Sequence, residues 1–561
     1  MKRQKTLLID VIFLLLLLIV VSVVFLDRPH LFPRSSQEIN LQMRLLPLYA
    51  LYSFLRMLSA YALALIFSIC VGYFAAVNLR ARKWILPALD IFQSIPILAF
   101  FPAAVFFFIR LFRGHPIGVE FAEVFLIFTS QVWNMAFSVY ESIITIPEDL
   151  LLAADEFNVQ GWRRWRRLIL PACVPRLTYN SMLSWAGGWY FLTASEIIAI
   201  GPARYTLPGL GSYIGQAMNS GRMDLMLAGL LSLVGLVVLL YILVWNPANW
   251  WSQNYLYEMS VAASGRAPMP AIARWIRRSR VLRVVNEHLF LPGGRSLLRL
   301  SAELGQLTSN RGFRLGLSLL FAGFLVLLGY GIFLAVRSIF RPLAREVAGI
   351  PLAILLSFLR LLVAYLLSLA WTIPVAILVG QSKRLARWLL PAVQITASIP
   401  ATAFFPLLVI LTLSYGLSMN GVAILLVLTG MQWYLLFNLI AGVLNIPADL
   451  KEVSQALGLR GWRYWKRVLF PAMLPSLVTG SITAWGGGWN ALIISEFVEA
   501  RGQIHRVRGI GALLDQATYQ EGNLQVIVFA VMSMVIVITV INKAFWRPTY
   551  AYVSEKFKME Y

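Results

Sequence analysis

Long apolar runs alternate with short polar and basic segments along almost the whole chain of 561 residues. A hydrocarbon core about 30 Å thick needs about 20 apolar residues in a helix. Runs of that length centre on 7–26, 47–77, 85–109, 119–146, 171–200 and 223–245, and then on 315–336, 351–380, 389–414, 420–443, 471–499 and 524–542. The pattern predicts an all-α polytopic membrane protein of about twelve transmembrane helices, six in each half.

The first apolar run, 7–26, has two interpretations. It follows Lys2, Arg3 and Lys5, and a basic start before an apolar segment is typical of a signal peptide. However, no small-x-small cleavage site follows the run, and a second run at 316–335 occupies the equivalent place inside the chain. A signal peptide cannot lie there, so we predict that 7–26 is a helix of the mature protein.

The Lys and Arg residues fall unevenly on the two sides of the predicted membrane. With the N-terminus inside, the inside segments carry 32 of the 48 basic residues and the outside loops carry 13. The other three, Arg56, Arg176 and Arg360, lie within predicted helices. Because cytoplasmic loops are enriched in Lys and Arg, both termini are predicted to be cytoplasmic.

The composition agrees with a membrane location. Hydrophobic residues make up 59% of the chain and charged residues 13%, whereas soluble domains are about 25% charged. A net charge of +23 would suggest a nucleic-acid partner in a soluble protein. Here the inside bias accounts for much of that charge, so no nucleic-acid partner is predicted. Cys70 and Cys173 give neither a disulfide framework nor a metal-ligand spacing.

The two halves of the chain repeat one another. The offset is 304 residues before the outside loop at 110–120 and 300 residues after it. The matched positions include Arg56 with Arg360, Pro96 with Pro400, Trp133 with Trp433, Trp185 with Trp485, Trp189 with Trp489 and Glu196 with Glu496. One shift shared by so many Trp, Pro and charged positions indicates that one module occurs twice.

An even number of helices in each half gives both halves the same orientation in the membrane. The sequence therefore predicts a parallel repeat about an axis along the membrane normal, with a substrate pathway between the halves. The predicted boundaries are a first module at 1–250, a cytoplasmic linker at 251–314 and a second module at 315–561. The linker mixes basic and apolar residues at roughly helical spacing, which favours an amphipathic tether on anionic lipid. A regulatory contact with a partner protein is the alternative.

The largest loop within each half, 147–170 and 447–470, lies on the predicted inside face. In the second loop, Pro447 and the acidic residues after it suit a helix start. Gly458 and Gly461 then allow a sharp turn before a short basic and aromatic stretch. The pattern predicts two short helices joined by a turn, which together form a compact cytoplasmic knob.

The second knob carries a more specific pattern, Glu452-Val453-Ser454, three further residues, Gly458, and Pro471 after twelve more. This pattern resembles the EAA loop of ABC importer permeases with the MetI-like type I fold, and the tract that follows is most similar to the nitrate/sulfonate/taurine branch. The resemblance covers both halves and leaves out only the linker. In that family the loop forms the coupling helix that docks in a groove of the ATPase subunit. The resemblance therefore implies that these residues, with Gly461, form a docking segment.

The first knob departs from the family pattern. Its corresponding positions are Leu152, Ala153, Ala154, Asn158 and Gly161, so the Glu and the first Gly are replaced. Asn tolerates a left-handed turn conformation, so the bend is expected to survive, while equal coupling by both halves stays open. An ordinary basic juxtamembrane loop, touching anionic lipid through interfacial Trp, is the alternative for both knobs.

The resemblance also implies partners. No G-x-x-x-x-G-K-[ST] motif occurs in the chain, so no cofactor is predicted here, and ATP and Mg²⁺ are expected on separate subunits. Two knobs imply two cytoplasmic ABC ATPase subunits, identical or not. The family implies an extracytoplasmic substrate-binding protein, import as the direction and the bacterial inner membrane as the location. The branch suggests a small anion or small organic nutrient, such as nitrate, a sulfonate or bicarbonate.

An ion-coupled secondary carrier is the main alternative, because such carriers also have twelve helices in two parallel halves. Glu196 and Glu496 support it, since intramembrane carboxylates often couple protons or ions. Pairing of these glutamates with Arg56 or Arg360 is the interpretation that we favour, and the two arginines could instead attract an anionic substrate. A membrane-embedded enzyme has little support, because the chain has no HExxH motif and no His cluster.

Prolines and tryptophans complete the predicted pathway. Pro breaks the helical hydrogen-bond ladder, and Gly permits close approach of helices. The candidates for lining or gating are Arg56, Pro96, Trp185, Trp189, Glu196, Arg360, Pro400, Trp485, Trp489 and Glu496. Packing inside each half is the alternative role for any of the tryptophans.

Overall fold

The computed structural model describes residues 39–94, 117–198, 207–255, 344–382, 399–416, 418–444, 448–500, 503–517 and 523–556, together with isolated positions between these ranges. The predicted helices at 7–26 and 315–336, and the predicted linker beyond residue 255, lie outside the described residues. The number of twelve helices therefore stays a prediction.

The first half is helical in the part that the structure describes. Its elements are a 3-10 turn at Met43–Leu45, α2 (Leu46–Val77), α3 (Leu79–Ser94), α5 (Ile117–Ile144), α6 (Glu148–Glu156), α7 (Gly161–Arg164), α8 (Leu170–Ile198), α9 (Leu210–Asn219), α10 (Met223–Leu240), α11 (Asn246–Ser252) and a 3-10 turn at Gln253–Tyr255. Five-residue π-helical turns, Trp165–Ile169 and Tyr241–Trp245, join α7 to α8 and α10 to α11.

The second half repeats this order. Its elements are a 3-10 turn at Arg345–Gly349, α16 (Ile350–Gln381), α18 (Ala401–Ser414), α19 (Met419–Leu444), α20 (Ala448–Ala456), α21 (Gly461–Tyr464), α22 (Phe470–Ser495), β1 (Phe497–Ala500), β2 (Gln503–Arg506), α23 (Ile510–Asp515), α24 (Leu524–Ile541) and α25 (Arg547–Lys556). The same π-helical turns recur at Trp465–Leu469 and Asn542–Trp546.

A small antiparallel hairpin departs from the all-helical prediction. Strands β1 and β2 pair with Phe497 opposite Arg506 and Ala500 opposite Gln503. The hairpin follows α22 directly, in a segment where the sequence pattern predicts the end of a helix and an outside loop. It is the only sheet in the described part of the chain, so the fold remains an all-α membrane protein in its architecture.

Six helices in the described residues are long and apolar enough to cross a membrane. They are Met43–Val77, Met223–Tyr255, Arg345–Gly380, Met419–Leu444, Gly461–Ser495 and Gln525–Lys556. Each overlaps a span predicted from the sequence. These helices carry apolar residues on most of their surface, as expected where both lipid and neighbouring helices must be contacted.

Close packing of helices within each half depends on glycine. At Gly188 in α8, a Cβ atom would overlap the side-chain nitrogen of Gln131 on α5. At the equivalent Gly488 in α22, it would lie 2.5 Å from a methyl group of Leu361 on α16. No larger residue fits at these crossings without displacing a neighbour, which is the usual reason for small residues at membrane helix contacts.

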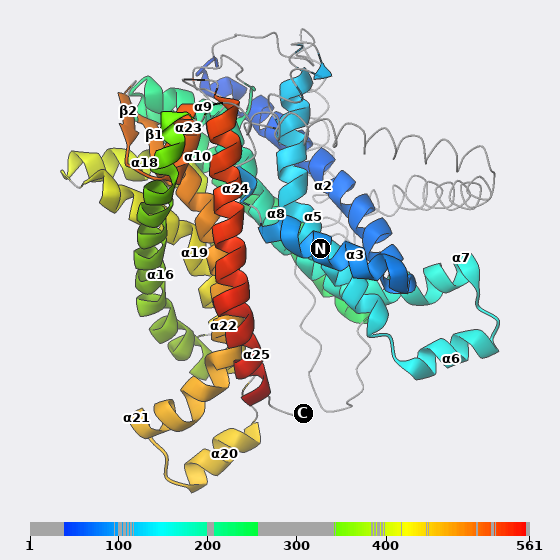
Figure 1. Cartoon of the computed structure of the whole chain (residues 1–561). Helices are drawn as coiled ribbons and strands as arrows, with labels where there is room; N and C mark the ends of the chain where they lie inside the picture. Colours follow the sequence, from blue (N-terminus) through cyan, green and yellow to red (C-terminus); the bar gives the residue numbers. More distant parts are fainter. Residues whose placement is uncertain are drawn as a thin grey trace, which may run out of the picture.

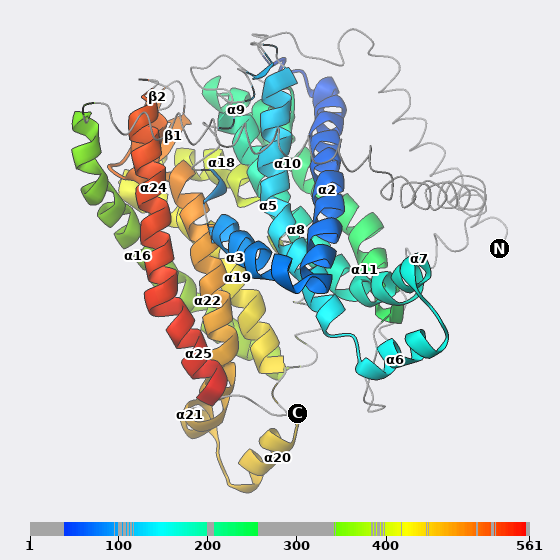
Figure 2. The same cartoon turned by 45° about the vertical axis from the view of Figure 1, so that its right-hand side comes forward.

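The two halves are oriented alike. The pair α20–α21 projects from the end of the molecule opposite to the hairpin and α23, whereas the pair α6–α7 projects sideways from the first half at about mid-height, away from α9 (Figure 1, Figure 2). Each of the two knobs predicted from the sequence therefore lies at the end of its own half that is away from α9 or α23, as a parallel repeat requires.

Candidate functional site

Both knobs begin with a nine-residue helix. In the first knob α6 starts after Pro147, whose backbone is extended, and carries Glu148 and Asp149 in its first turn. Acidic side chains there interact favourably with the positive end of the helix dipole. In the second knob α20 spans Ala448–Ala456, with the same length at the equivalent position.

The two helices end in the same turn. In the first knob Asn158 has a φ of 51°, and the amide of Val159 donates to the carbonyl of Ala154 at 2.7 Å. In the second knob Gly458 has a φ of 66°, and the amide of Leu459 donates to the carbonyl of Ser454 at 2.9 Å. This is the hydrogen-bond pattern of a helix closed by a left-handed residue. The replacement of glycine by asparagine has therefore left the bend unchanged.

A second left-handed residue reverses the chain toward the membrane. Gly161 has a φ of 54° and Gly461 a φ of 55°, and each opens the short helix that leads through a π-helical turn into α8 or α22. A φ in this range favours glycine, because a Cβ atom would crowd the backbone. The left-handed backbone conformation thus explains why both of these positions hold glycine.

Each knob has a buried inner side and an exposed apolar outer side. Ala154 and Ser454 are 9% and 2% exposed and face the helices behind them. On the outer side, Leu152 and Phe157 are 56% and 81% exposed, and Val453 and Leu457 are 54% and 70% exposed. Ala153 is partly buried, and the Glu452 side chain is exposed. Exposed apolar side chains at the polar end of a membrane protein are typical of a protein–protein contact.

A buried ion pair lies near the opposite end of the first half. Arg56 on α2 and Glu196 on α8 are joined at 2.7 Å between Nη1 and Oε1. The same carboxylate accepts hydrogen bonds from the Ser53 hydroxyl at 2.8 Å and from the Gly211 amide at 2.6 Å. The Leu210 amide donates to Ser53 at 3.0 Å. The cluster ties α2, α8 and the start of α9 together.

The second half contains the same cluster. Arg360 Nη1 lies 2.7 Å from Glu496 Oε1, and Ser357 and the Gly511 amide donate to this carboxylate at 2.6 and 2.8 Å. The Ile510 amide donates to Ser357 at 2.9 Å. The pairing of these charges, which the sequence offers as one alternative, is thus observed in both halves.

The surroundings of the two arginines differ. Arg56 also contacts Glu120, at 2.7 Å from Nε, and Glu123, at 3.3 Å. Arg360 instead donates to Asn420 at 2.9 Å and to the Arg508 carbonyl at 2.7 Å. Neither Glu120 nor Glu123 was among the residues predicted from the sequence, although both lie in a predicted helix. The sequence does show that Asn420 stands at the position equivalent to Glu120. This replacement could have indicated that the two arginines have different partners.

The candidate tryptophans pack inside their own halves. Trp185 lies 5.3 Å from Tyr61 and 5.7 Å from Trp245, measured between ring centroids. Trp485 has matching neighbours, Tyr365 at 5.7 Å and Trp546 at 5.9 Å.

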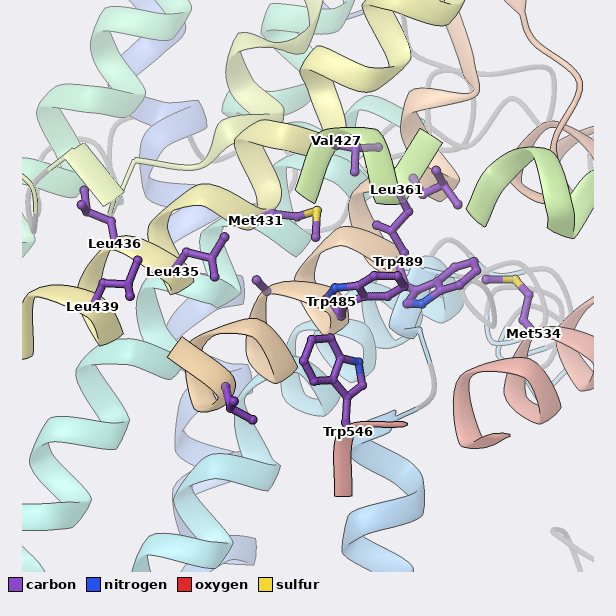
Figure 3. Packing of buried hydrophobic residues seen from close by; sticks show 14 of the residues in the cluster. Leu361, Val427, Met431, Leu435, Leu436, Leu439, Trp485, Trp489, Met534 and Trp546 are labelled. Carbon is purple, nitrogen blue, oxygen red and sulfur yellow. The ribbon is translucent and has the colours of Figure 1, made fainter. Parts of the chain in front are cut away.

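Figure 3 shows Trp485, Trp489 and Trp546 together among the buried residues of the second half. Trp189 and Trp489 are 0% and 2% exposed. Of the two roles that the sequence leaves open for these residues, the geometry favours packing.

Trp245 and Trp546 do not stand out in the sequence. They are 301 residues apart, one more than the offset that relates the rest of this region, so the match is not visible at a fixed shift. Each ends a π-helical turn and thereby completes the aromatic cluster of its half.

Hydrogen bonds between the two halves are made by residues that come shortly after two prolines in the sequence. Pro96 and Pro400 are buried, and each precedes residues that bond to the other half. The Ile97 amide donates to the Asn490 side chain at 2.7 Å, and the Thr402 hydroxyl donates to the Tyr190 carbonyl at 3.0 Å.

The residues that accept these bonds correspond in the repeat. Asn490 and Tyr190 are equivalent residues on α22 and α8, and Thr402 also bonds to Thr193 of α8. Ile97 of the first half thus bonds to α22 of the second half, and α18 of the second half bonds to α8 of the first.

Comparison with known families decides between a carrier and a permease. The family model described as "Binding-protein-dependent transport system inner membrane component" matches residues 68–246 and again residues 372–547. The two matches together cover more than half of the chain. The chain belongs to this permease family. It is a multi-pass inner-membrane protein with two permease modules in one polypeptide.

Curated relatives resemble one module at a time. The "Nitrate import permease protein NrtB" of Synechococcus elongatus is 31% identical over 156 residues, 28% of this chain and 54% of the relative. The "Bicarbonate transport system permease protein CmpB" of the same species is 31% identical over 161 residues, again 28% and 54%. A "Probable ABC transporter permease protein" of Brucella melitensis is 27% identical over 145 residues, 26% and 55%. The chain spans about half the length of the curated relatives it matches.

Proposed function

We propose that this permease forms both membrane halves of an ATP-driven importer for a small anion of the nitrate or bicarbonate class. Substrate would arrive from an extracytoplasmic binding protein and pass between the two halves. Two separate ATPase subunits would bind ATP and Mg²⁺ and drive transport through the knobs. The similarity to the nitrate and bicarbonate permeases of Synechococcus elongatus supports the substrate class.

The knobs carry this proposal. They have one backbone geometry, each lies at the end of its own half away from α9 or α23, and they expose the side chains of Phe157 and Leu457. Each knob continues through a π-helical turn into the long helix α8 or α22. A movement imposed on a knob is therefore transmitted along a continuous helix to the contacts between halves.

Such a movement would change the hydrogen bonds between the two halves. The bond of Ile97 to Asn490 and the bond of Thr402 to Tyr190 hold the halves together. Each bond is worth about 1 kcal/mol net, so a small rotation of α8 against α22 can exchange them for others. We assign alternating access to this exchange.

The two buried arginines are not proposed as the anion site. Arg56 and Arg360 are 5% and 8% exposed and already bind Glu196 and Glu496. The same pairing weakens the support for an ion-coupled carrier, because an arginine, a serine and a backbone amide already occupy three of the about four acceptor positions of each carboxylate.

Charge reversal in the second knob tests the ATPase contact. Glu452→Arg places a cation where the family pattern has an exposed acid, and we expect ATP hydrolysis by the co-purified complex to fall at least about tenfold, equivalent to about 1.4 kcal/mol of lost coupling. The control is Glu521→Arg, which makes the same change at an exposed position outside the knobs. Equal activity of the two variants would contradict the proposal.

A further inference from the structure

The two knobs differ in charge although their backbones match. Residues 148–158 contain four acidic and no basic residues, whereas residues 448–458 contain two acidic residues and one lysine. The first knob therefore has a formal charge of −4 on this segment and the second a charge of −1. All four acidic side chains of the first knob are exposed.

Helix stability explains only half of these acidic residues. Glu148 and Asp149 lie in the first turn of α6, where they favour the helix. Asp155 and Glu156 lie in its last turn, where a negative charge is unfavourable for the same reason. Asp155 is offset by Arg164, 2.5 Å away.

The second knob has Gln455 and Ala456 at the same two positions. The fold of the knob thus does not require acids there, since the turn closes identically without them.

The apolar surface of the knobs differs as well. Beside the acidic turn, Phe157 is 81% exposed where the second knob has Leu457. One turn earlier, Leu152 is 56% exposed where the second knob has Glu452. A carboxylate and an isobutyl group need opposite surroundings in a contact, because an unpaired charge is costly to desolvate. The two knobs therefore offer different surfaces to a docking groove at these positions.

We propose that the two knobs dock two non-identical ATPase subunits. The subunit at the first knob presents an apolar groove with a basic rim, which receives Leu152 and Phe157 and faces Asp155 and Glu156. The subunit at the second knob offers a donor to Glu452 and lacks that rim. Complementary charge at an interface contributes more to specificity than to affinity. The difference in charge between the two knobs therefore determines which ATPase subunit binds each half. The inference rests on the proposed function.

Site-specific crosslinking in the complete transporter tests this pairing. A photo-crosslinking amino acid is placed at Gln160 or at Arg460, exposed and equivalent positions at the end of the turn. Mass spectrometry then identifies the captured polypeptide. We expect a different ATPase polypeptide at each position. Capture of the same polypeptide at both positions would overturn the inference and leave the proposed function standing. Capture of no ATPase at either position would overturn both.

Exchange of the residues at the end of the two knob helices tests directly whether the acidic side chains of the first knob contact a basic rim. Asp155→Gln with Glu156→Ala gives the first knob the residues of the second. We expect binding of the first-knob subunit to weaken about fivefold at low salt, as for the loss of two rim charge pairs, with the difference shrinking at high salt. The converse variant, Gln455→Asp with Ala456→Glu, should not weaken it. Unchanged binding in the first variant would contradict a basic rim.

Discussion

Replacing Glu496 by alanine is expected to lower the free energy of unfolding of the second half by about 3–5 kcal/mol. The change leaves the guanidinium of Arg360 buried without its carboxylate, together with the Ser357 hydroxyl and the Gly511 amide that donate to it. Thermal or denaturant unfolding of the detergent-solubilised complex measures the loss.

The matched variant in the first half provides the control. Glu196→Ala removes the equivalent carboxylate, but Arg56 keeps Glu120 and Glu123 as partners. We therefore expect a loss of about half the size, since only hydrogen bonds are left unsatisfied and no charge is left alone. An equal or larger loss for Glu196→Ala would show that the surplus acids do not compensate Arg56.

Replacing Gly458 by valine is expected to reduce ATP-driven uptake at least about tenfold. A left-handed conformation costs an ordinary residue about 1–2 kcal/mol, and a β-branched residue adopts it still less readily. The turn therefore opens, and the exposed Leu457 leaves the position that it has in the folded knob. Uptake into proteoliposomes that contain the complete transporter, with ATP enclosed, measures the effect.

Asn158→Gly serves as the matched control in the first knob. The φ of 51° at Asn158 suits glycine at least as well as asparagine, so uptake should remain near that of the unchanged protein. Full uptake by the Gly458→Val variant would mean that the second turn has no part in coupling.

The long-range repeat is the most informative feature of the sequence. An offset of 304 residues relates Arg56 to Arg360, and an offset of 300 residues relates Glu196 to Glu496. Both pairs occupy equivalent positions in the fold. The prediction works because a buried ion pair constrains both partners, so both halves retain them. The same repeat correctly predicts a knob with the same turn in each half.

Side-chain contacts between helices could not be predicted from the sequence pattern. Apolar periodicity cannot distinguish a tryptophan that lines a pathway from one that packs in a core, because both are apolar positions on a helix. The sequence therefore leaves the roles of Trp185 and Trp485 open, and only their ring contacts with Tyr61 and Tyr365 favour packing. The partners of Arg56 are missed for a related reason, because Glu120 lies 64 residues away and has no carboxylate counterpart in the second half.

The short hairpin β1–β2 is missed for a different reason. Its strands have four residues each, and a run that short carries too few alternations to distinguish it from the frayed end of an apolar helix. The π-helical turns are likewise invisible to a period of 3.6 residues, although they place Trp245 and Trp546.

The fusion of two modules lets equivalent positions take different residues without changing the backbone. The cluster around Arg56 has more carboxylates than the cluster around Arg360, and the first knob has more negative charge than the second. The hydrogen bonds that hold the cluster and close the turn of the knob are nevertheless the same in each half. In the proposed transporter, coupling by two unequal knobs is the functional counterpart of that divergence.

Uptake by the reconstituted transporter tests the central claim most directly. The permease is placed in liposomes with its co-purified ATPase subunits and binding protein, and nitrate and bicarbonate are supplied as probes. We predict uptake that requires ATP on the side of the knobs and does not respond to a proton or sodium gradient alone. Uptake driven by such a gradient in liposomes that lack the ATPase subunits would contradict the account.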